Sequence, residues 1–288
     1  MRRFGPYGPV VDAVRIDLRW LRRILIVGVA SLALAHVVAD VVLQISSDLF
    51  NLNEESTLGT WASTMLLATA AVGCWIAGRV APRPTRLGWR VAGAALGLMS
   101  LDEVAMLHER MGTIVSNHLS TGGPLFFAWV IPGSVVAVSM LIALVLFARR
   151  LDRRTAVMLV TGAAIFFFGA VGVEMIGGNE IAGGLSDSRT FVAVEESRLY
   201  LLTTALEESL ELVGEAILVH TVARYLCLTL AGDQDGDVHV PVVVARPSTL
   251  WAGPRPSMPA DPGAIGLHDL QRPSPGDGAG VNPSQDAR

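Results

Sequence analysis

Residues 126–147 read FFAWVIPGSVVAVSMLIALVLF, 22 residues in a row without an ionisable side chain. A membrane-spanning α-helix needs about 20 such residues, because each residue adds about 1.5 Å across a hydrocarbon core of about 30 Å. Five more apolar windows of similar length lie on either side of this one. We therefore predict an all-α polytopic membrane protein, a bundle of six transmembrane helices at about 24–45, 61–77, 91–111, 126–147, 156–176 and 199–226.

The composition of the whole chain points to the same class. Of its 288 residues, 51% are hydrophobic and only 17% are charged, with a mean hydropathy of +0.49, whereas soluble domains carry about 25% charged residues. Cys74 and Cys227 lie in apolar runs, which excludes a disulfide-stapled scaffold and a CxxC zinc module. A net charge of −4 argues against nucleic-acid binding, and no nucleotide or haem motif is present.

Arginine supplies all 22 basic residues, and its distribution predicts the orientation of the chain. Six arginines precede the first window, and further groups lie at 79–90 and 149–154, between later windows. Cytoplasmic loops of membrane proteins are enriched in basic residues. With both termini in the cytoplasm, 19 of the 22 arginines lie inside and only Arg110, Arg189 and Arg198 lie outside. Residues 1–23 are then a cytoplasmic segment, and residues 24–230 form the transmembrane domain.

Residues 231–288 differ in composition from the rest of the chain and predict a disordered cytoplasmic tail. Nine of the fifteen prolines fall between Pro241 and Pro283, and no helical apolar period is present. The short apolar stretch Val238–Val244 could pair as a strand, although we favour a tether or an unspecific tail. Within the spans, small residues such as Gly93 and Gly97 favour close helix packing inside one chain. A homo-oligomer is the alternative that this pattern leaves open.

Ionisable residues are concentrated in four of the six windows. Each charged group near the bilayer centre costs about 2.5–3.5 kcal/mol on insertion scales, so such residues must face a protein interior or a water-filled cavity. The outer half of the bundle offers only Arg110, Arg198, His36 and His108 as positive partners. Protons, a bound cation or water must neutralise the remaining acids. The nine carboxylates within the windows are Asp40, Asp102, Glu103, Glu109, Glu174, Glu207, Glu208, Glu211 and Glu215.

Counting residues from the nearest cytoplasmic arginine places these groups in two layers. The first layer, 12 or 13 residues in, holds His36, Asp102, Glu103 and Glu211, and the second, 16 to 20 residues in, holds Asp40, His108, Glu109, Glu174, Glu207 and Glu208. The four acids of the last window share one helix face. On a continuous helix, Asp102 and Glu109 lie about 10.5 Å apart along the axis and serve different layers. The pattern predicts an acidic funnel that opens to the outer face.

Carboxylate oxygens and imidazole nitrogens gathered from several helices are ligands for a divalent metal, with Zn, Mn and Fe not distinguished by this pattern. Protonatable carboxylates can equally bind and release a proton or another cation during transport. The predicted cation site consists of Asp102, Glu103, His108, Glu109, Glu208 and Glu211, supported by His36, Asp40, Glu174, Glu207 and Glu215. The first hypothesis is transport or sensing of a metal ion or proton. A metal-dependent hydrolase acting on lipid and a structural scaffold are the alternatives.

Some of these acids also have a simpler interpretation. Glu174 falls at the end of the fifth window, where a solvated helix terminus is the commoner role. Glu195 and Glu196 precede the sixth window, and Glu54 and Glu55 precede the second. We interpret these four as loop acids that could form a rim and attract cations.

Three motifs carry a resemblance to a known family. They are Asn53-Glu54-Glu55 with Trp61 and Ser63, Ser100-Leu101-Asp102-Glu103 with Leu107-His108-Glu109, and Glu207-Glu208-Ser209-Leu210-Glu211. From about residue 24 to residue 226 the chain resembles a widespread uncharacterised family of bacterial six-span membrane proteins, for which no activity is established. The resemblance implies a bacterial cytoplasmic (inner) membrane. The chain is similar in part only to alkaline-ceramidase and progestin-receptor-like membrane hydrolases, whose zinc sites use several histidines, and it has no His-xxx-His pair.

Overall fold

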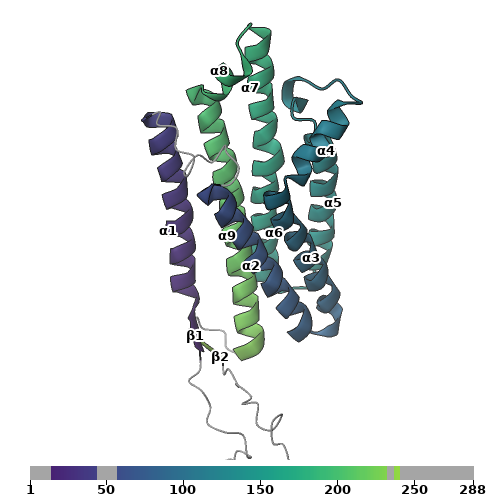
Figure 1. Ribbon diagram of the computed structural model, residues 1–288. Coiled ribbons are helices and arrows are strands. Elements are labelled where there is room, and N and C mark those ends of the chain that lie inside the picture. Colours follow the sequence, from purple (N-terminus) through teal and green to yellow (C-terminus); the bar gives the residue numbers. More distant parts are fainter. Residues whose placement is uncertain (1–13, 44–56, 232–236, 241–288) are drawn as a thin grey trace, which may run out of the picture. The chain divides into compact units, whose positions relative to one another are not determined.

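The computed structural model describes residues 14–43, 57–231 and 237–240, and this part of the chain is almost entirely helical (Figure 1). The long helices are α1 (Leu18–His36), α2 (Leu58–Val80), α3 (Arg83–Ala105), α5 (Val130–Ala148), α6 (Arg153–Phe167) and α9 (Arg198–Ala231). The shorter helices are α4 (Leu107–Ser116), η2 (Gly123–Leu125), α7 (Glu174–Ser186) and α8 (Phe191–Glu195). Two π-helical segments, η1 (Val37–Val42) and η3 (Phe168–Val173), extend α1 and join α6 to α7.

Five stretches of the described chain are long and apolar enough to cross a membrane, and the number rises to six if α3 and α4 form one bent span. The five stretches are Leu18–Ala39, Leu58–Val80, Val130–Ala148, Arg153–Ser186 and Arg198–Leu230. They overlap the windows predicted from the sequence. The prediction of one continuous helix at 91–111 is wrong, because the helix breaks at Met106 and the axis turns by 73°. The last two residues of the first window, 44 and 45, lie outside the described residues.

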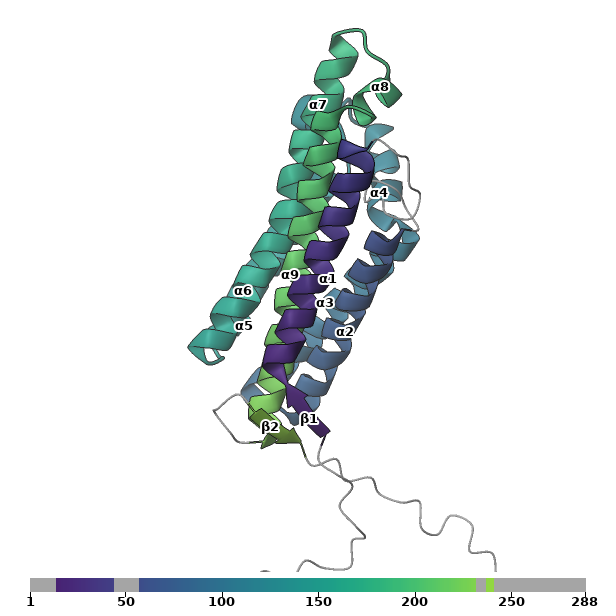
Figure 2. The same ribbon diagram turned by 90° about the vertical axis from the view of Figure 1, so that its left-hand side faces the viewer.

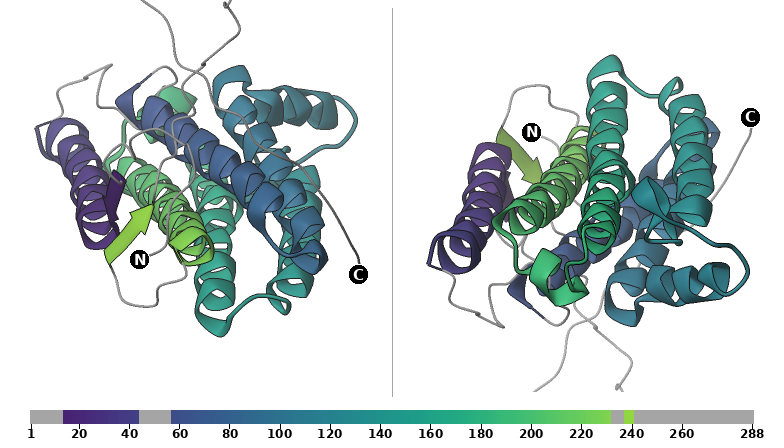
Figure 3. Two further views of the ribbon diagram at one scale, coloured as in Figure 1. Left: turned by 90° about the horizontal axis from the view of Figure 1, so that it is seen from below. Right: turned by 90° about the horizontal axis from the view of Figure 1, so that it is seen from above.

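Helix α9 lies at the centre of the bundle, in contact with α1, α2 and α6 (Figure 3). Glycines let α6 and α9 approach each other closely, since a Cβ on Gly214 would lie 2.7 Å from the carbonyl oxygen of Gly162. Gly169 makes a similar approach, because a Cβ there would lie 2.9 Å from the carbonyl oxygen of Glu207. A Cβ on Gly93 would lie 3.0 Å from the carbonyl oxygen of Ala71 on α2. These small residues therefore pack helices within one chain.

The arginine-rich turns meet at one end of the bundle. Arg150, after α5, donates a hydrogen bond from Nη1 to the carbonyl oxygen of Pro84 at the start of α3, at 3.3 Å. Arg224 of α9 donates from Nη1 to Thr155 Oγ1 at 2.9 Å and lies 3.6 Å from Asp152 Oδ1. The turns before α3 and before α6 are thereby joined to each other and to α9. The grouping agrees with the shared side that the arginine pattern predicts for these loops.

Asp152 also caps α6, because its Oδ1 accepts a hydrogen bond from the backbone N–H of Thr155 at 3.0 Å. Partial burial alone would raise the pKa of Asp152. The hydrogen bonds from Thr155 and the charge of Arg224 outweigh that effect and hold the pKa of the carboxyl below its ordinary value. The turn is thus stabilised most when Asp152 is ionised.

A pair of short strands lies beside this end of the bundle (Figure 2). Strand β1 (Val14–Asp17) precedes α1 and pairs antiparallel with β2 (Asp237–Val240), which follows α9, with Val14 opposite Val240 and Asp17 opposite Asp237. Four residues of the predicted tail are therefore ordered as a strand, and three of them, residues 238–240, belong to the apolar stretch that the sequence left open to pairing. Residues 232–236 and 241–288 of that tail lie outside the described residues.

Candidate functional site

The break between α3 and α4 is the feature that shapes the site. Met106, between the two helices, adopts a left-handed backbone conformation with φ 50° and ψ 45°, which costs a residue with a Cβ roughly 1–2 kcal/mol. The Asp102 carboxylate offsets this cost. Its Oδ1 accepts a hydrogen bond from the backbone N–H of His108 at 2.9 Å, which satisfies one of the donors that a helix start leaves without a partner. The acid thus caps α4 from the previous helix.

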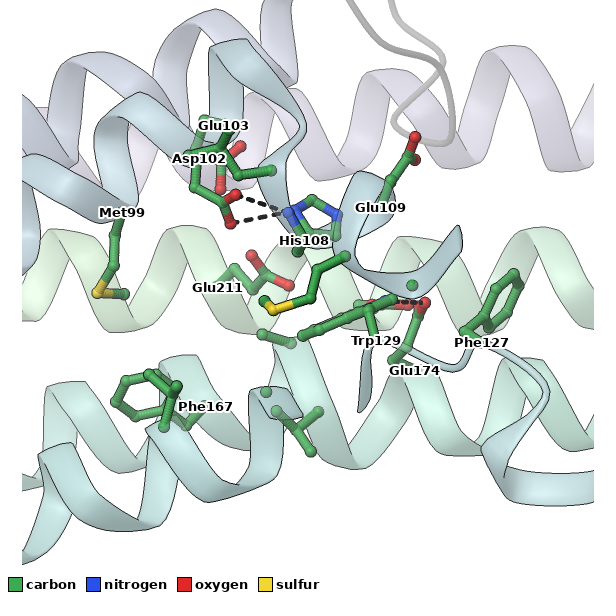
Figure 4. Close-up of a pocket in the computed structure, with 18 of the residues that line it drawn as sticks. Met99, Asp102, Glu103, His108, Glu109, Phe127, Trp129, Phe167, Glu174 and Glu211 are labelled. Atoms are coloured by element: carbon green, nitrogen blue, oxygen red, sulfur yellow. Dashed lines mark hydrogen bonds and ion pairs between the residues drawn. The ribbon is translucent and has the colours of Figure 1, made fainter. Parts of the chain in front are cut away.

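The same carboxylate also holds the ring of His108, because Oδ2 of Asp102 lies 3.0 Å from Nδ1 of the histidine (Figure 4). An ionised carboxylate only accepts hydrogen bonds, so Nδ1 carries the hydrogen in this contact. Nε2 is then the ring atom through which His108 can accept a proton or bind a ligand. On the uninterrupted helix expected from the sequence these two side chains would lie more than one turn apart. The bend brings the two side chains together. The separation expected between Asp102 and Glu109 assumed a continuous helix, so it does not apply to the bent pair.

Trp129, just before α5, connects His108 to the α7 side of the site. Its ring meets the His108 ring edge-on with the centroids 4.9 Å apart, and its Nε1 donates a hydrogen bond to Glu174 Oε1 at 3.0 Å (Figure 4). Glu207 on α9 lies close enough to Glu174, the first residue of α7, for the two carboxyl groups to interact electrostatically. The contacts run from α3 through α4 and α7 to α9.

Glu207, Glu208 and Glu211 reach the site from one face of α9, as their spacing predicts. The charges that act on Glu211 come from Glu208, Glu103, Glu215 and Glu174, and all four are acidic. Gly169 on η3 permits this face to lie close, since a Cβ there would stand 3.1 Å from Cγ of Glu211. The acids of α9 therefore depend on a small residue of the neighbouring helix for their position.

These side chains line one pocket with a volume of about 900 Å³. Its acidic lining residues are Asp102, Glu103, Glu109, Glu174, Glu195, Glu207, Glu208 and Glu211, and none of its lining residues is an arginine. The remaining wall is largely apolar and aromatic. Figure 4 shows Phe127 near the acidic part and Met99 with Phe167 further along the helices. The pocket thus has an acidic region and an apolar region.

The pocket gathers eight of the eleven residues predicted for the cation site. All six of the core set, Asp102, Glu103, His108, Glu109, Glu208 and Glu211, line it, together with Glu174 and Glu207 from the supporting set. Glu174 is therefore a wall residue of the pocket in addition to beginning a helix. The side chain of the ninth residue, Asp40 on η1, lies outside the described part of the chain.

His36 and Glu215, the remaining two, are buried elsewhere in the bundle. His36 is fully buried, and its Nε2 lies 3.4 Å from the carbonyl oxygen of Leu201 on α9. Glu215 is also 0% exposed, and its Oε1 accepts a hydrogen bond from Ser63 Oγ of α2 at 2.6 Å. Its Oε2 has no hydrogen-bond partner among the described residues. Neither residue lines the pocket, because each faces a neighbouring helix that covers it.

Sequence reasoning missed several residues of the site. Nothing in the sequence indicates that the indole of Trp129 donates a hydrogen bond to Glu174. Glu195, interpreted as a loop acid with a rim role as an alternative, lines the pocket, as do Tyr200 and Thr204 at the start of α9. The one available signal for Tyr200 was its helix phase, since it precedes Glu207 by two turns.

The chemistry of the pocket follows from its groups. Carboxylates bind cations or protons, and the Asp102–His108 pair can take up a proton from water or a substrate. Among residues 14–43, 57–231 and 237–240, no three His, Cys, Asp or Glu side chains are already arranged to hold a metal ion. Zinc, manganese or iron binding therefore stays a prediction.

Most of the chain matches the model of one protein family. No curated protein and no solved structure matches the chain. One family model, described as a domain of unknown function (DUF8692), matches residues 23–226. This range covers all of the site residues and every helix from the body of α1 to most of α9. Since the match spans more than two thirds of the sequence, the chain belongs to the DUF8692 family.

Proposed function

We propose that this chain is a protein of the bacterial cytoplasmic membrane that binds a cation in the acidic pocket. The arginine-rich end with β1 and β2 faces the cytoplasm, and the pocket opens on the opposite side. The six spans are α1, α2, the bent pair α3–α4, α5, α6–α7 and α9. The bound cation, a metal ion, a proton or an organic cation, is either transported or sensed.

The proposal rests on the charge balance of the pocket. Eight carboxyl groups line it and no arginine does. Two like charges 4 Å apart repel by about 4 kcal/mol at an effective dielectric constant of 20, and each charge in a span has a further insertion cost. Protons relieve this repulsion when the pocket is empty. A cation that enters can displace them, so binding and proton release are expected to occur together.

Cation titration of purified protein in phosphatidylcholine nanodiscs tests the proposal. Mn²⁺, Zn²⁺ and small organic cations are titrated by calorimetry, with a pH-indicator dye to detect released protons and metal analysis of the purified protein. Glu208→Gln and Glu211→Gln should each weaken binding at least tenfold and reduce proton release. Asp187→Asn removes an exposed acid that does not line the pocket and should leave cation binding and proton release unchanged.

Two outcomes of this titration oppose the proposal. Binding that is equal in wild type, Glu208→Gln and Glu211→Gln would place the cation elsewhere. The absence of any cation binding or proton release would leave the structural-scaffold hypothesis as the better one. Flux measurements in liposomes then separate transport from sensing.

A specific contact favours a second function, the metal-dependent hydrolysis of a lipid. The Asp102–His108 pair is the arrangement that holds an imidazole ready to accept a proton from water, and a metal held by the acids could activate that water. Under this hypothesis metal-loaded protein releases a lipid fragment, and His108→Gln abolishes turnover. Metal binding by the wild type without any lipid turnover would favour the first function.

A further inference from the structure

The shape and lining of the pocket lead us to infer, on the basis of the proposed cation binding, that its ligand is an amphiphilic amine. The protonated amine occupies the acidic region, and an attached hydrocarbon chain occupies the apolar region. The ligand enters from the lipid between α3 and α5. The charge balance of the pocket indicates a cation, and the apolar region adds that this cation carries a hydrocarbon chain.

The acidic region fits a protonated amine. Figure 4 shows Glu211 beside Asp102 and His108. Glu207 and Glu208 line the same pocket, and the leading charges that act on Glu211 are all acidic. An alkylammonium group has N–H donors for several carboxylates at once. Aromatic rings in the same wall, those of Phe127, Trp129 and Tyr200, attract cations through their π-faces. Acids with aromatic rings are the combination that recognises organic ammonium groups.

The apolar region continues the pocket away from these acids. It is lined by Leu98 and Met99 of α3, Val136 and Met140 of α5, and Phe166 and Phe167 of α6. Methionine and phenylalanine side chains adapt to flexible hydrocarbon chains. A metal ion or a proton would need none of this space, whereas a volume of about 900 Å³ in total is in the range of pockets for drug-sized ligands.

The wall between α3 and α5 reaches the outer surface of the bundle. Leu98 and Val136 both line the pocket, yet their exposed fractions are 65% and 51%. In a membrane these surfaces contact lipid chains. A ligand with a hydrocarbon chain can therefore keep its chain in an apolar environment along the entire path into the pocket.

Equilibrium dialysis of octylamine against the protein in phosphatidylcholine nanodiscs tests the inference, with protein-free nanodiscs subtracted. The comparison compounds are ethylamine, which keeps the charge without the chain, octanol, which keeps the chain without the charge, and Mn²⁺. Octylamine should bind at least tenfold more tightly than ethylamine, since each buried methylene gives up to about fourfold in affinity. Octanol should bind at least tenfold more weakly than octylamine.

Variants assign the two regions separately. Glu211→Gln should weaken octylamine binding at least tenfold, and Asp187→Asn should not change it. Val136→Trp or Leu98→Trp, introduced from two different helices, should fill the apolar region and remove the preference for octylamine over ethylamine. Ethylamine binding by these two variants shows that they fold.

The outcomes distinguish the ligand class from the proposed function. One outcome is that binding of Mn²⁺ or ethylamine depends on Glu211 while octylamine binds no more tightly. The proposed cation site then stands, and the inference of an amphiphilic ligand is overturned. Equal binding of octanol and octylamine identifies an ordinary lipid groove and also overturns the inference. If no cation depends on Glu211, both proposals fall.

Discussion

At the scale of single residues, Asp102 combines two roles that the sequence could not separate. Its carboxylate caps α4 through the backbone of His108 and fixes the ring of the same residue. The first contact belongs to folding and the second to the chemistry of the pocket. One side chain therefore couples the position of the helix break to the orientation of the imidazole.

Removal of the Asp102 carboxylate should destabilise the fold. Asp102→Ala loses both hydrogen bonds and should lower the free energy of unfolding by about 1–3 kcal/mol, as for a lost helix cap with a charged partner. Asp102→Asn keeps an acceptor for the His108 N–H and should lose less. SDS titration of the protein in detergent micelles measures both. Asp187→Ala, at an exposed position after α7, is the control, and an equal loss there would contradict the capping role.

Ser63 should matter through the buried acid that it contacts. In Ser63→Ala, Glu215 Oε1 loses its 2.6 Å donor, and an unsatisfied buried acceptor costs about 1–3 kcal/mol. The melting temperature in detergent should therefore fall. Ser116→Ala removes a hydroxyl at an exposed position that bonds only within its own turn and should leave the melting temperature nearly unchanged. A similar fall in both variants would show that the Ser63–Glu215 contact contributes nothing specific.

At the scale of helices, the close approach of α6 and α9 sets the distance across the pocket. Gly162, Gly169 and Gly214 bring the two backbones together, and the acids of α9 project from the same region. Packed helices in lipid gain little from apolar burial, because lipid chains are as apolar as leucine. Backbone proximity and small residues therefore contribute more here than side-chain hydrophobicity.

Two glycine substitutions should have opposite effects. In Gly214→Ala the new Cβ would stand 2.7 Å from backbone atoms of both Gly162 and Phe166, and overpacking of this kind costs about 1–3 kcal/mol. In Gly183→Ala on α7 nothing lies within 4 Å of the new Cβ, so alanine should stabilise by up to about 1 kcal/mol through its helix propensity. Thermal unfolding in detergent measures both. Stabilisation by Gly214→Ala would contradict the packing described.

The turn before α6 should make stability depend on acid pH. The folded-state pKa of Asp152 lies below its unfolded value, so its contribution is complete above the unfolded pKa and is lost as the pH falls through the folded pKa. Asp152→Asn keeps a capping acceptor and removes the charge. Its melting temperature should fall less than that of wild type between about pH 5 and about pH 3. An identical fall in the two proteins would show that ionisation of Asp152 does not stabilise this turn.

The helices and the pocket were predictable to different degrees. Apolar length predicted five long apolar helices within a few residues at most ends, because an unbroken apolar run is a property of local composition. Helix phase brought Glu207, Glu208 and Glu211 to one wall. The break at Met106 was not predictable, since it depends on a contact between Asp102 and a backbone N–H six residues later. His36 and Glu215 were placed at plausible depths, but the neighbouring helices that cover them are set by tertiary packing.

At the scale of the whole molecule, the arginine-rich turns and the acids of the pocket lie towards opposite ends of the bundle. The contacts of Arg150 with Pro84 and of Arg224 with Asp152 gather the basic turns. The acids of the pocket lie at the far end of α3, on α4, at the start of α7, on α8 and in the first half of α9. A membrane that places basic loops in the cytoplasm would thereby direct the pocket outward.

Cysteine labelling in intact cells checks this orientation. Cys74 and Cys227 are buried and should react little with a membrane-impermeant maleimide. Ser120→Cys, between α4 and η2, should react from outside, whereas Arg149→Cys, between α5 and α6, should react only after the cells are opened. Both positions are exposed. The reverse pattern would invert the proposed orientation and place the pocket on the cytoplasmic side.

The antiparallel pairing of β1 with β2 has a consequence for how the chain could be rearranged. The pairing brings the residue before the first helix and the residues after the last helix into register, and neighbouring ends of this kind are the usual condition for circular permutation. A circular permutant could start near Asn117, in the exposed connection after α4, with a short linker joining the ends at the two strands. Every helix would then pack against the same helices as before. The order in which the spans leave the ribosome would change, while the finished arrangement would stay the same.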